Sequence, residues 1–312
     1  FVNHEWVYRL GSDYFYSYNT LILTAYFENQ ANPISYSFIS SLLVKTFNID
    51  DYFVYRLPSL FGSILLLYAL AKFNNIWLLL VVGLNPLIWI YSGRAYSEML
   101  SVGLMVFALH SANIYIRGFL SLFSAIVKYH SLPLILTYSV FAFIFDFRRQ
   151  KITWFNQHIY SVVGLIGGFA FFIFLYFKSF GIWVVPEKFA SAHFNITFLS
   201  VTNNLFSYCF YLSGMFFLSI PAFLNTEKLK LKVILLVLSI LLGLTNQNLG
   251  EMDFGSFQQL LGNEIILLIK IIGFWNFLLC CQAFWKDEES RILLLTILGY
   301  ILLLSLTRPA NR

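Results

Sequence analysis

Long, uninterrupted runs of apolar residues recur along this chain and restrict what it can fold into. Clear examples are Ser161–Tyr176, Val233–Leu244 with its flanks, and Ile292–Leu306. An α-helix needs about 20 mostly apolar residues to cross the hydrocarbon core of a bilayer. Strands of a membrane β-barrel would alternate polar and apolar positions. Only 11% of the residues are charged, against about 25% in soluble domains. We therefore predict an all-α, polytopic transmembrane protein.

The first 54 residues differ from the rest because they mix acidic, basic and aromatic residues and form no clean span. Two amphipathic pieces are visible in them, near residues 14–26 and 34–47. Such pieces are typical of helices that lie in the plane of the membrane surface. We predict that residues 1–54 form a long extracytoplasmic loop with interfacial helices, and that residues 55–312 form the transmembrane domain.

That domain is predicted to contain nine or ten spans. Pro133 breaks the hydrogen-bond ladder of a helix, so the short segments around it are either one kinked helix or two half-spans. The sequence starts at Phe1 without an initiator Met, which favours a piece of a longer protein with a preceding span missing. The candidate spans lie near residues 56–72, 76–92, 96–116, 119–130, 131–147, 159–180, 203–224, 231–247, 262–285 and 291–306.

Basic residues in the short loops predict the orientation of the spans, because cytoplasmic loops carry an excess of Lys and Arg. Three clusters meet this criterion, at residues 148–151, 228–232 and 286–291. An even number of predicted spans separates neighbouring clusters, so all three can lie in the cytoplasm. The same scheme places residues 1–54, the turn at 91–97 and His130 outside. The net charge of +5 is thus explained by topology, and no nucleic-acid partner is predicted.

Ionisable residues collect on the predicted outer face. Such residues at membrane depth are costly and are therefore candidates for function, although each could instead snorkel or form a structural pair. The set comprises Glu5, Asp13, Asp50, Asp51, Arg56, Arg94, Glu98, Lys128, Arg308 and Arg312.

Two carboxylates near the start of the chain are candidates for acid–base chemistry. Glu5 lies in the stretch Asn3-His4-Glu5-Trp6, and Asp13 follows it. A carboxylate near the interface can act as a general base on a hydroxyl group. The alternative for either residue is an ordinary solvated loop acid.

Two further stretches carry cations at predicted span ends. Arg94 and Glu98 stand four residues apart after a polar turn, so they would share a helix face and could pair. The planar guanidinium of Arg94 could instead hold a phosphate. Lys128, in the stretch Lys128-Tyr129-His130, could neutralise an anion arriving from the lipid or simply anchor the interface.

Other chemistries lack their sequence signatures. The chain contains no phosphate loop, no GxGxxG and no nucleophile elbow. Its cysteines, Cys209, Cys280 and Cys281, form no metal-binding spacing. We identify no metal-binding cluster of carboxylates beyond Asp50-Asp51, so neither a metal nor another cofactor is predicted. The scattered glycines, including Gly164, Gly167 and Gly168, indicate close helix packing.

The order of several motifs resembles one large family. Asn32-Pro33-Ile34-Ser35-Tyr36 is followed by Arg56-Leu57-Pro58-Ser59-Leu60-Phe61-Gly62 and then by the turn Tyr91-Ser92-Gly93-Arg94. This order is similar to that of the GT-C glycosyltransferases with lipid-phosphate donors, such as protein O-mannosyltransferases and the aminoarabinose transferase of lipid A. Lys128 fits a lysine common in the following helices of the family. The closing Arg308-Pro309-Ala310-Asn311-Arg312 looks like the start of its late Arg-Tyr element.

The chain departs from the family pattern at two places. The first loop of the family usually carries Asp-Glu, where this chain has His4-Glu5, and its His-Pro-Pro element is reduced here to Asn32-Pro33. The catalytic carboxylate therefore stays open between Glu5 and Asp13.

The resemblance implies transfer of a sugar, with inversion, from a polyprenyl-phosphate carrier to a hydroxyl acceptor on a protein, lipid or glycan at the outer membrane face. It implies donor phosphate binding by Arg94, Lys128, Arg56 and Arg308, with His4, Tyr91, Glu98 and His130 in support. The bacterial inner membrane is the favoured location and the endoplasmic reticulum membrane the alternative.

Two other functions fit the same charges. One is a transporter or flippase for a lipid-linked or small polar solute, and the other is a non-catalytic subunit of a membrane complex. A pocket formed by residues 1–54 over the Arg94 turn would favour the enzyme. A continuous polar path through the helices would favour transport.

Overall fold

The computed structural model describes residues 5–29, 32–72, 76–111, 113–148, 152–183, 186, 197–224, 228–245, 256–286 and 288–306. Every regular element in these ranges is a helix, which agrees with the predicted all-α class. The chain divides into two compact units, Phe1–Ala190 and Ser191–Arg312.

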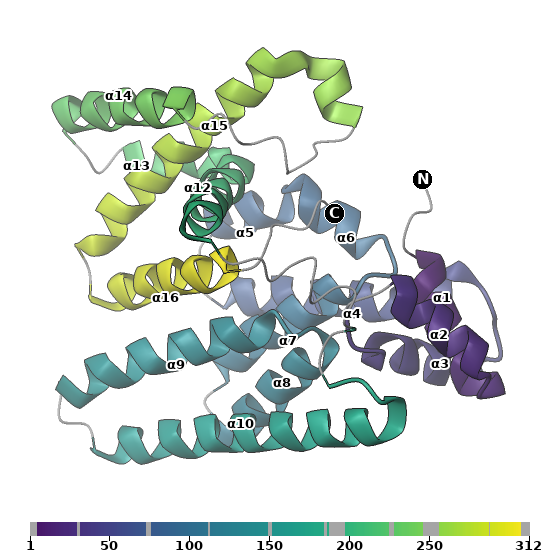
Figure 1. Cartoon of the computed structure of the whole chain (residues 1–312). Coiled ribbons are helices and arrows are strands. Elements are labelled where there is room, and N and C mark those ends of the chain that lie inside the picture. Colours follow the sequence, from purple (N-terminus) through teal and green to yellow (C-terminus); the bar gives the residue numbers. More distant parts are fainter. Residues whose placement is uncertain are drawn as a thin grey trace. The chain divides into compact units, whose positions relative to one another are not determined.

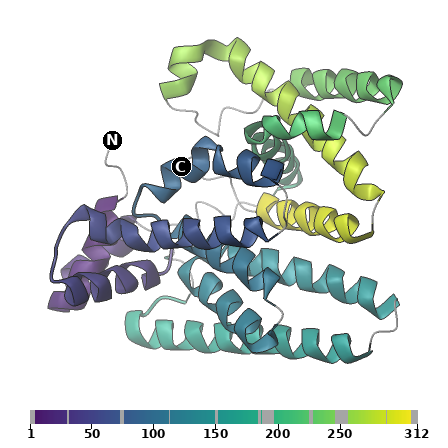
Figure 2. The ribbon, with the colours of Figure 1, turned by 180° about the vertical axis from the view of Figure 1, so that it is seen from behind.

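The first unit contains ten helices within its described ranges (Figure 1). Three short helices come first, and Figures 1 and 2 show them gathered at one end of α4. The helices are α1 (Glu5–Ser17), α2 (Thr20–Asn29), α3 (Ser35–Phe47), α4 (Tyr52–Ala71), α5 (Ile76–Gly83), α6 (Pro86–Ser92), α7 (Ser97–His110), α8 (Ile114–Val127), α9 (Ser131–Arg148) and α10 (Ile152–Phe180).

Three helices are long and apolar enough to cross a membrane. They cover Tyr52–Ala71, Val162–Phe180 and Glu264–Trp285, and shorter apolar helices accompany them at Ser97–His110, Ile114–Val127, Ser131–Phe145 and Ser290–Ser305. A 14-residue helix such as α7 is about 21 Å long, less than the roughly 30 Å of a hydrocarbon core. The structure therefore supports a membrane protein, and the predicted nine or ten full spans stay a prediction.

Several predicted helix boundaries were wrong because capping and turn residues outweigh hydrophobicity. The predicted piece 14–26 is split at Tyr18, whose φ of 52° is left-handed. Residues 76–92 are split before Pro86, which lacks an N–H and suits the first position of a helix. The predicted span 96–116 ends at His110, and Asn113 caps the next helix by accepting hydrogen bonds from the Tyr115 and Ile116 amides.

The segments around Pro133 are two separate helices, α8 and α9. Pro133 lies in the first turn of α9, where no intrahelical partner exists for its missing N–H. The predicted span 203–224 is likewise divided among three helical pieces. The piece near 34–47 corresponds to α3, Ser35–Phe47.

Helix α4 packs closely against α7 through small residues. A Cβ on Gly103 would collide with the carbonyl oxygen of Gly62, so the two backbones touch at this crossing. By contrast, a Cβ on Gly164 or Gly167 would meet open space. The prediction that those two glycines mark close packing was wrong, whereas Gly168 does face the Leu122 side chain.

The first unit has two chemically different ends. Ser59 of α4 contacts Tyr96 before α7, and the Lys72 ammonium at the far end of α4 lies 5.5 Å from the Phe107 ring centroid in α7. These helices therefore run in parallel, as the predicted orientation scheme requires. Helix α8 runs antiparallel to α7, since Arg117 at its start contacts the Ser111 carbonyl after α7. We call the end that carries Arg56, Arg94, Glu98 and Lys128 the charged end.

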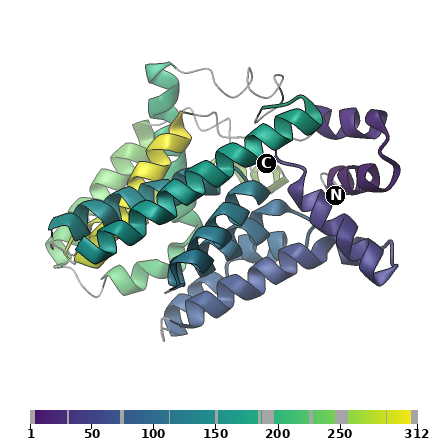
Figure 3. The ribbon, with the colours of Figure 1, turned by 90° about the horizontal axis from the view of Figure 1, so that it is seen from below.

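Helix α10 also reaches the charged end (Figure 3). The ring of its last residue, Phe180, lies 5.9 Å from that of Phe27 in α2, and Tyr176 belongs to the same buried cluster as Val7, Tyr26 and Ile34. The short helices α1–α3 are therefore held over the ends of α4, α7, α8 and α10 by an aromatic core.

The second unit is built from α12 (Phe198–Met215), the short 3-10 turn Phe217–Ser219, α13 (Ile220–Leu224), α14 (Leu229–Thr245), α15 (Ser256–Trp285) and α16 (Glu288–Ser305). Helix α12 packs against α15 and α16, and Cys209, Phe274 and Ile301 form the core between them. The Asn204 amide donates to the Ser305 carbonyl at 3.1 Å, which satisfies the end of α16.

Candidate functional site

Glu5 at the start of α1 is bound on both carboxylate oxygens. Oε1 accepts a hydrogen bond from Arg56 Nε at 2.9 Å and Oε2 accepts one from Arg56 Nη2 at 2.9 Å. The Ala95 amide donates a third bond to Oε1 at 2.9 Å. This bidentate pairing is the strong form of an arginine–carboxylate contact. It joins residues 51 and 90 positions apart in sequence, so Glu5 ties α1 to α4 and to the turn before α7.

The environment keeps Glu5 ionised. Its side chain is 8% exposed, and this burial raises its pKa. The hydrogen bonds from Arg56 and the Ala95 amide, together with the positive charges of Arg56 and Arg94, outweigh burial and leave the pKa below its ordinary value. A carboxylate in this state accepts a proton poorly, so the geometry favours a clamp over a general base.

Asp13 experiences the opposite environment. Burial raises the pKa of its carboxyl group, and the negative charge of Asp50 raises it further, while Arg9 offsets only part of the effect. Arg9 is itself committed to Asp50, with Nη2 at 2.9 Å from Oδ2, and Tyr55 donates a hydrogen bond to the other Asp50 oxygen at 2.9 Å. Within the described residues no side chain donates a hydrogen bond to the Asp13 carboxylate. Asp13 is therefore the more basic of the two candidates.

A second ion pair lies at the charged end between Glu98 in α7 and Lys128 after α8. Of the two alternatives for Arg94, the pair with Glu98 four residues away is not made, and Glu98 pairs with Lys128 instead. The Ser97 hydroxyl also contacts Glu98, at 3.5 Å, and it shares a 3.0 Å hydrogen bond with the Tyr8 hydroxyl. Tyr8 thus connects α1 to this second pair.

Arg94 stands out among the predicted phosphate-binding residues. Arg56 and Lys128 are neutralised by carboxylates, whereas the guanidinium of Arg94, half-buried in the turn between α6 and α7, makes no ion pair or hydrogen bond with the described part of the chain. Its charge acts on Glu5 and on Tyr91. An unpaired guanidinium held beside two compensated pairs is suited to bind an incoming anion.

Buried hydroxyl groups extend only a short way from the charged end into the helices. The hydroxyls of Ser101 in α7 and Ser124 in α8 are hydrogen-bonded at 3.1 Å. Ser121, also buried, lies about one turn of α8 further from the charged end. Beyond this level α7 presents Leu104, Met105 and Ala108, which are also buried. The polar groups described in α7 and α8 therefore form no path along the full length of these helices.

Two predicted site residues, His4 and Arg308, lie outside the described residues, and Arg312 does as well. His130 is exposed after α8, and its charge acts on Glu98. Tyr91 is half-buried at the end of α6, and its ring lies 5.6 Å from that of Tyr96. The structure thus brings Glu5, Arg56, Arg94, Glu98 and Lys128 to one end, while Asp13 lies about 12 Å further along α1.

Sequence reasoning missed three parts of this site. They are Tyr8, the backbone amide of Ala95, and Ser59, whose hydroxyl donates to the Tyr96 carbonyl at 2.7 Å and accepts from the Tyr96 amide at 3.1 Å. A backbone amide leaves no sequence pattern, and Ser59 stands in the Arg56-Leu57-Pro58-Ser59 motif without a role having been assigned to it. Tyr8 stands three residues after Glu5, and this helical spacing was the signal that could have found it.

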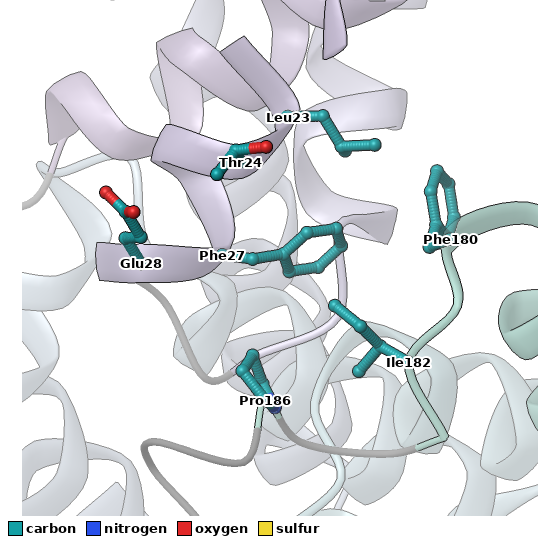
Figure 4. A pocket seen from close by; sticks show the side chains of 7 residues that line it. All are labelled: Leu23, Thr24, Phe27, Glu28, Phe180, Ile182 and Pro186. Atoms are coloured by element: carbon teal, nitrogen blue, oxygen red, sulfur yellow. The ribbon is translucent and has the colours of Figure 1, made fainter. Parts of the chain in front are cut away.

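An apolar cavity of about 310 Å³ lies between α2 and the residues that follow α10 (Figure 4). Figure 4 shows Phe27 and Ile182 turned towards each other with Phe180 nearby. The lining is completed by Leu23, Thr24, Glu28 and Pro186, so no predicted catalytic or phosphate-binding residue borders this cavity.

The described residues contain no group of three or more His, Cys, Asp or Glu side chains that could hold a metal ion. No known family model matches this chain, and no curated protein or solved structure matches it either. The functional argument therefore rests on the residues and their geometry.

Proposed function

We propose that this chain is a GT-C-like glycosyltransferase that moves a sugar from a polyprenyl-phosphate donor to a hydroxyl acceptor. The transfer takes place at the outer, periplasmic or lumenal, face of the membrane. The observation that carries the proposal is the half-buried, unpaired Arg94 at the charged end. Arg56 and Lys128 at the same end are already paired with carboxylates. Arg94 is therefore the cation there that is available to bind a phosphate.

In this proposal α1 forms part of the lid over the reacting groups. Glu5 contacts the Ala95 amide and Tyr8 contacts Ser97, so α1 lies over the turn that carries Arg94. The acceptor hydroxyl loses its proton to Asp13 as its oxygen attacks the anomeric carbon. The bond from that carbon to the phosphate oxygen breaks, and polyprenyl phosphate leaves with its charge at Arg94. In this displacement the acceptor oxygen and the leaving phosphate lie on opposite sides of the anomeric carbon. The base contacts the acceptor and Arg94 contacts the phosphate, so the two residues need not contact each other.

The remaining residues have supporting roles. Glu5 and Arg56 hold the Arg94 turn, and Glu98 and Lys128 hold the junction of α7 and α8. Membrane lipids surround the apolar helices, with α1–α3 as interfacial helices, and the favoured location is a bacterial inner membrane. The shallow extent of the buried hydroxyls in α7 and α8 supports an enzyme over a transporter or flippase.

The test is transfer from radiolabelled polyprenyl-phosphate sugars in vesicles that contain the purified chain. Arg94→Ala should raise the donor KM by roughly tenfold or more, since a charge-assisted contact to phosphate is worth about 1.5–3 kcal/mol. Arg117→Ala, at the opposite end of α8, is the matched control and should leave transfer unchanged. Equal donor KM values in wild type and Arg94→Ala would refute the phosphate site.

A further inference from the structure

Two tyrosines flank Arg94 in sequence and contact each other in space. Tyr91 is near the end of α6 and Tyr96 directly precedes α7, and their ring centroids lie 5.6 Å apart at an interplanar angle of 57°. Both side chains are half-buried. Each therefore packs with part of its surface against the helices and leaves another part accessible.

The rings are supported from behind. Tyr96 packs against the buried cluster that includes Tyr8, Tyr36 and Leu100, and its ring lies 6.3 Å from that of Tyr8. Tyr91 packs against the separate cluster of Leu66, Leu70 and Met99. Because each ring packs against its own buried cluster, the pair would lose little conformational freedom on binding a ligand.

Arg94 stands beside this pair. It lies in the turn between α6 and α7, three residues after Tyr91 and two before Tyr96. Gly93, between them, adds no side chain to the turn and is exposed.

We infer that Tyr91 and Tyr96 form a platform for the pyranose ring of the donor, next to the phosphate at Arg94. The ligand class is a hexose joined through its anomeric oxygen to a lipid phosphate. The C–H face of the sugar would lie on the aromatic surfaces, which carry partial negative charge, while the phosphate takes the cation. This inference rests on the proposed function, because Arg94 serves as the phosphate anchor in both.

If this platform exists, the two tyrosines contribute to binding of the sugar, and Arg94 contributes to binding of the phosphate. We would measure binding of radiolabelled polyprenyl-phosphate mannose, glucose and galactose to the purified full chain in nanodiscs. Sugar-free polyprenyl phosphate is the second ligand. Tyr91→Met and Tyr96→Met remove the ring and keep a flexible apolar side chain in part of its space. Each should weaken binding of the tightest sugar donor about three- to tenfold and leave sugar-free polyprenyl phosphate unchanged.

Two kinds of variant complete the design. Tyr91→Phe and Tyr96→Phe keep the ring and should bind the donor within about twofold of wild type. Tyr115→Met removes an exposed tyrosine from α8, near the opposite end, and should change neither ligand. The ratio of the two dissociation constants decides the outcome, because unfolded protein lowers the binding capacity for both lipids alike.

The failures are distinguishable. Should the Met variants weaken both lipids equally, or neither, the platform is wrong while the Arg94 site stands. Should Arg94→Ala bind both lipids as wild type does, the phosphate site and with it the proposed function are wrong. A loss of sugar selectivity in the Met variants together with a loss of both ligands in Arg94→Ala supports both proposals.

Discussion

The two carboxylates of α1, Glu5 and Asp13, lie in environments that shift their pKa values in opposite directions. At the start, Glu5 is 8% exposed and accepts three hydrogen bonds, from Arg56 and the Ala95 amide. Two turns later, Asp13 lies near Arg9 and Asp50, but Arg9 is engaged by Asp50 in a pair that is 38% and 53% exposed. The pKa is lowered at Glu5 and raised at Asp13.

This difference teaches how to separate a structural acid from a reactive one. Both residues stand in the same helix and both are candidates by residue type. A carboxylate whose oxygens are fully used stabilises the fold and resists protonation, whereas a poorly compensated one remains basic. The following predictions test this contrast, starting with the largest effect.

Asp13→Asn should reduce sugar transfer by about 10²- to 10⁴-fold, the usual contribution of a general base. The donor KM should change little, because Asp13 is assigned to the acceptor proton and not to the phosphate. Transfer kinetics with labelled polyprenyl-phosphate sugar give both parameters. Asp51→Asn is a matched control on a nearby aspartate that caps α4. Full activity in Asp13→Asn would remove Asp13 as the base.

Glu5→Gln should lower the stability of the folded chain by on the order of 2 kcal/mol, because it leaves Arg56 facing an amide and breaks a pair in which Glu5 is buried and Arg56 is partly exposed. Thermal unfolding in detergent measures the loss. The control is Asp50→Asn, which breaks the exposed pair with Arg9 and should cost about 1 kcal/mol or less. If both substitutions cost the same, the distinction between the two ends of α1 fails.

The stability supplied by Glu5 should depend on pH. Its folded-state pKa lies below the unfolded value of 4.5, so its contribution is fully present above that value and is lost as the pH falls through the lowered folded pKa. The difference in unfolding temperature between wild type and Glu5→Gln should therefore shrink below pH 4.5. A difference that stays constant down to strongly acidic pH would contradict the lowered pKa.

Asp50→Asn should shift the pH profile of transfer. Asp13 must be deprotonated to act, so the rate falls with decreasing pH through a pKa above the ordinary aspartate value of 3.8. Removing the negative charge of Asp50 and releasing Arg9 both favour ionised Asp13, so the acidic limb should move to lower pH. Tyr16, which lies near Asp13 and Asp50, stays neutral in this range because burial and these two negative charges raise its pKa. An unshifted limb would show that Asp13 does not control the profile.

Part of this architecture could be predicted from local sequence. Hydrophobic runs predicted helices and an apolar environment, and the alternation of loop charges predicted that Arg56, Arg94 and Lys128 share one end. Helix boundaries were less predictable. The breaks at Tyr18, Pro86 and Asn113 depend on single capping or turn residues, which hydrophobicity averaged over a window does not resolve.

The sequence by itself determined which chemical groups are present and which end of the helices they occupy, because apolar periodicity and charge placement are local properties. Only the tertiary structure decided how the charges are paired. Glu98 binds Lys128 and not Arg94, and Glu5 binds residues 51 and 90 positions away. Such pairings depend on contacts between distant segments, and no local pattern encodes them. These pairings leave the Arg94 guanidinium without an ion pair among the described residues. They also make Asp13, not Glu5, the more basic carboxylate.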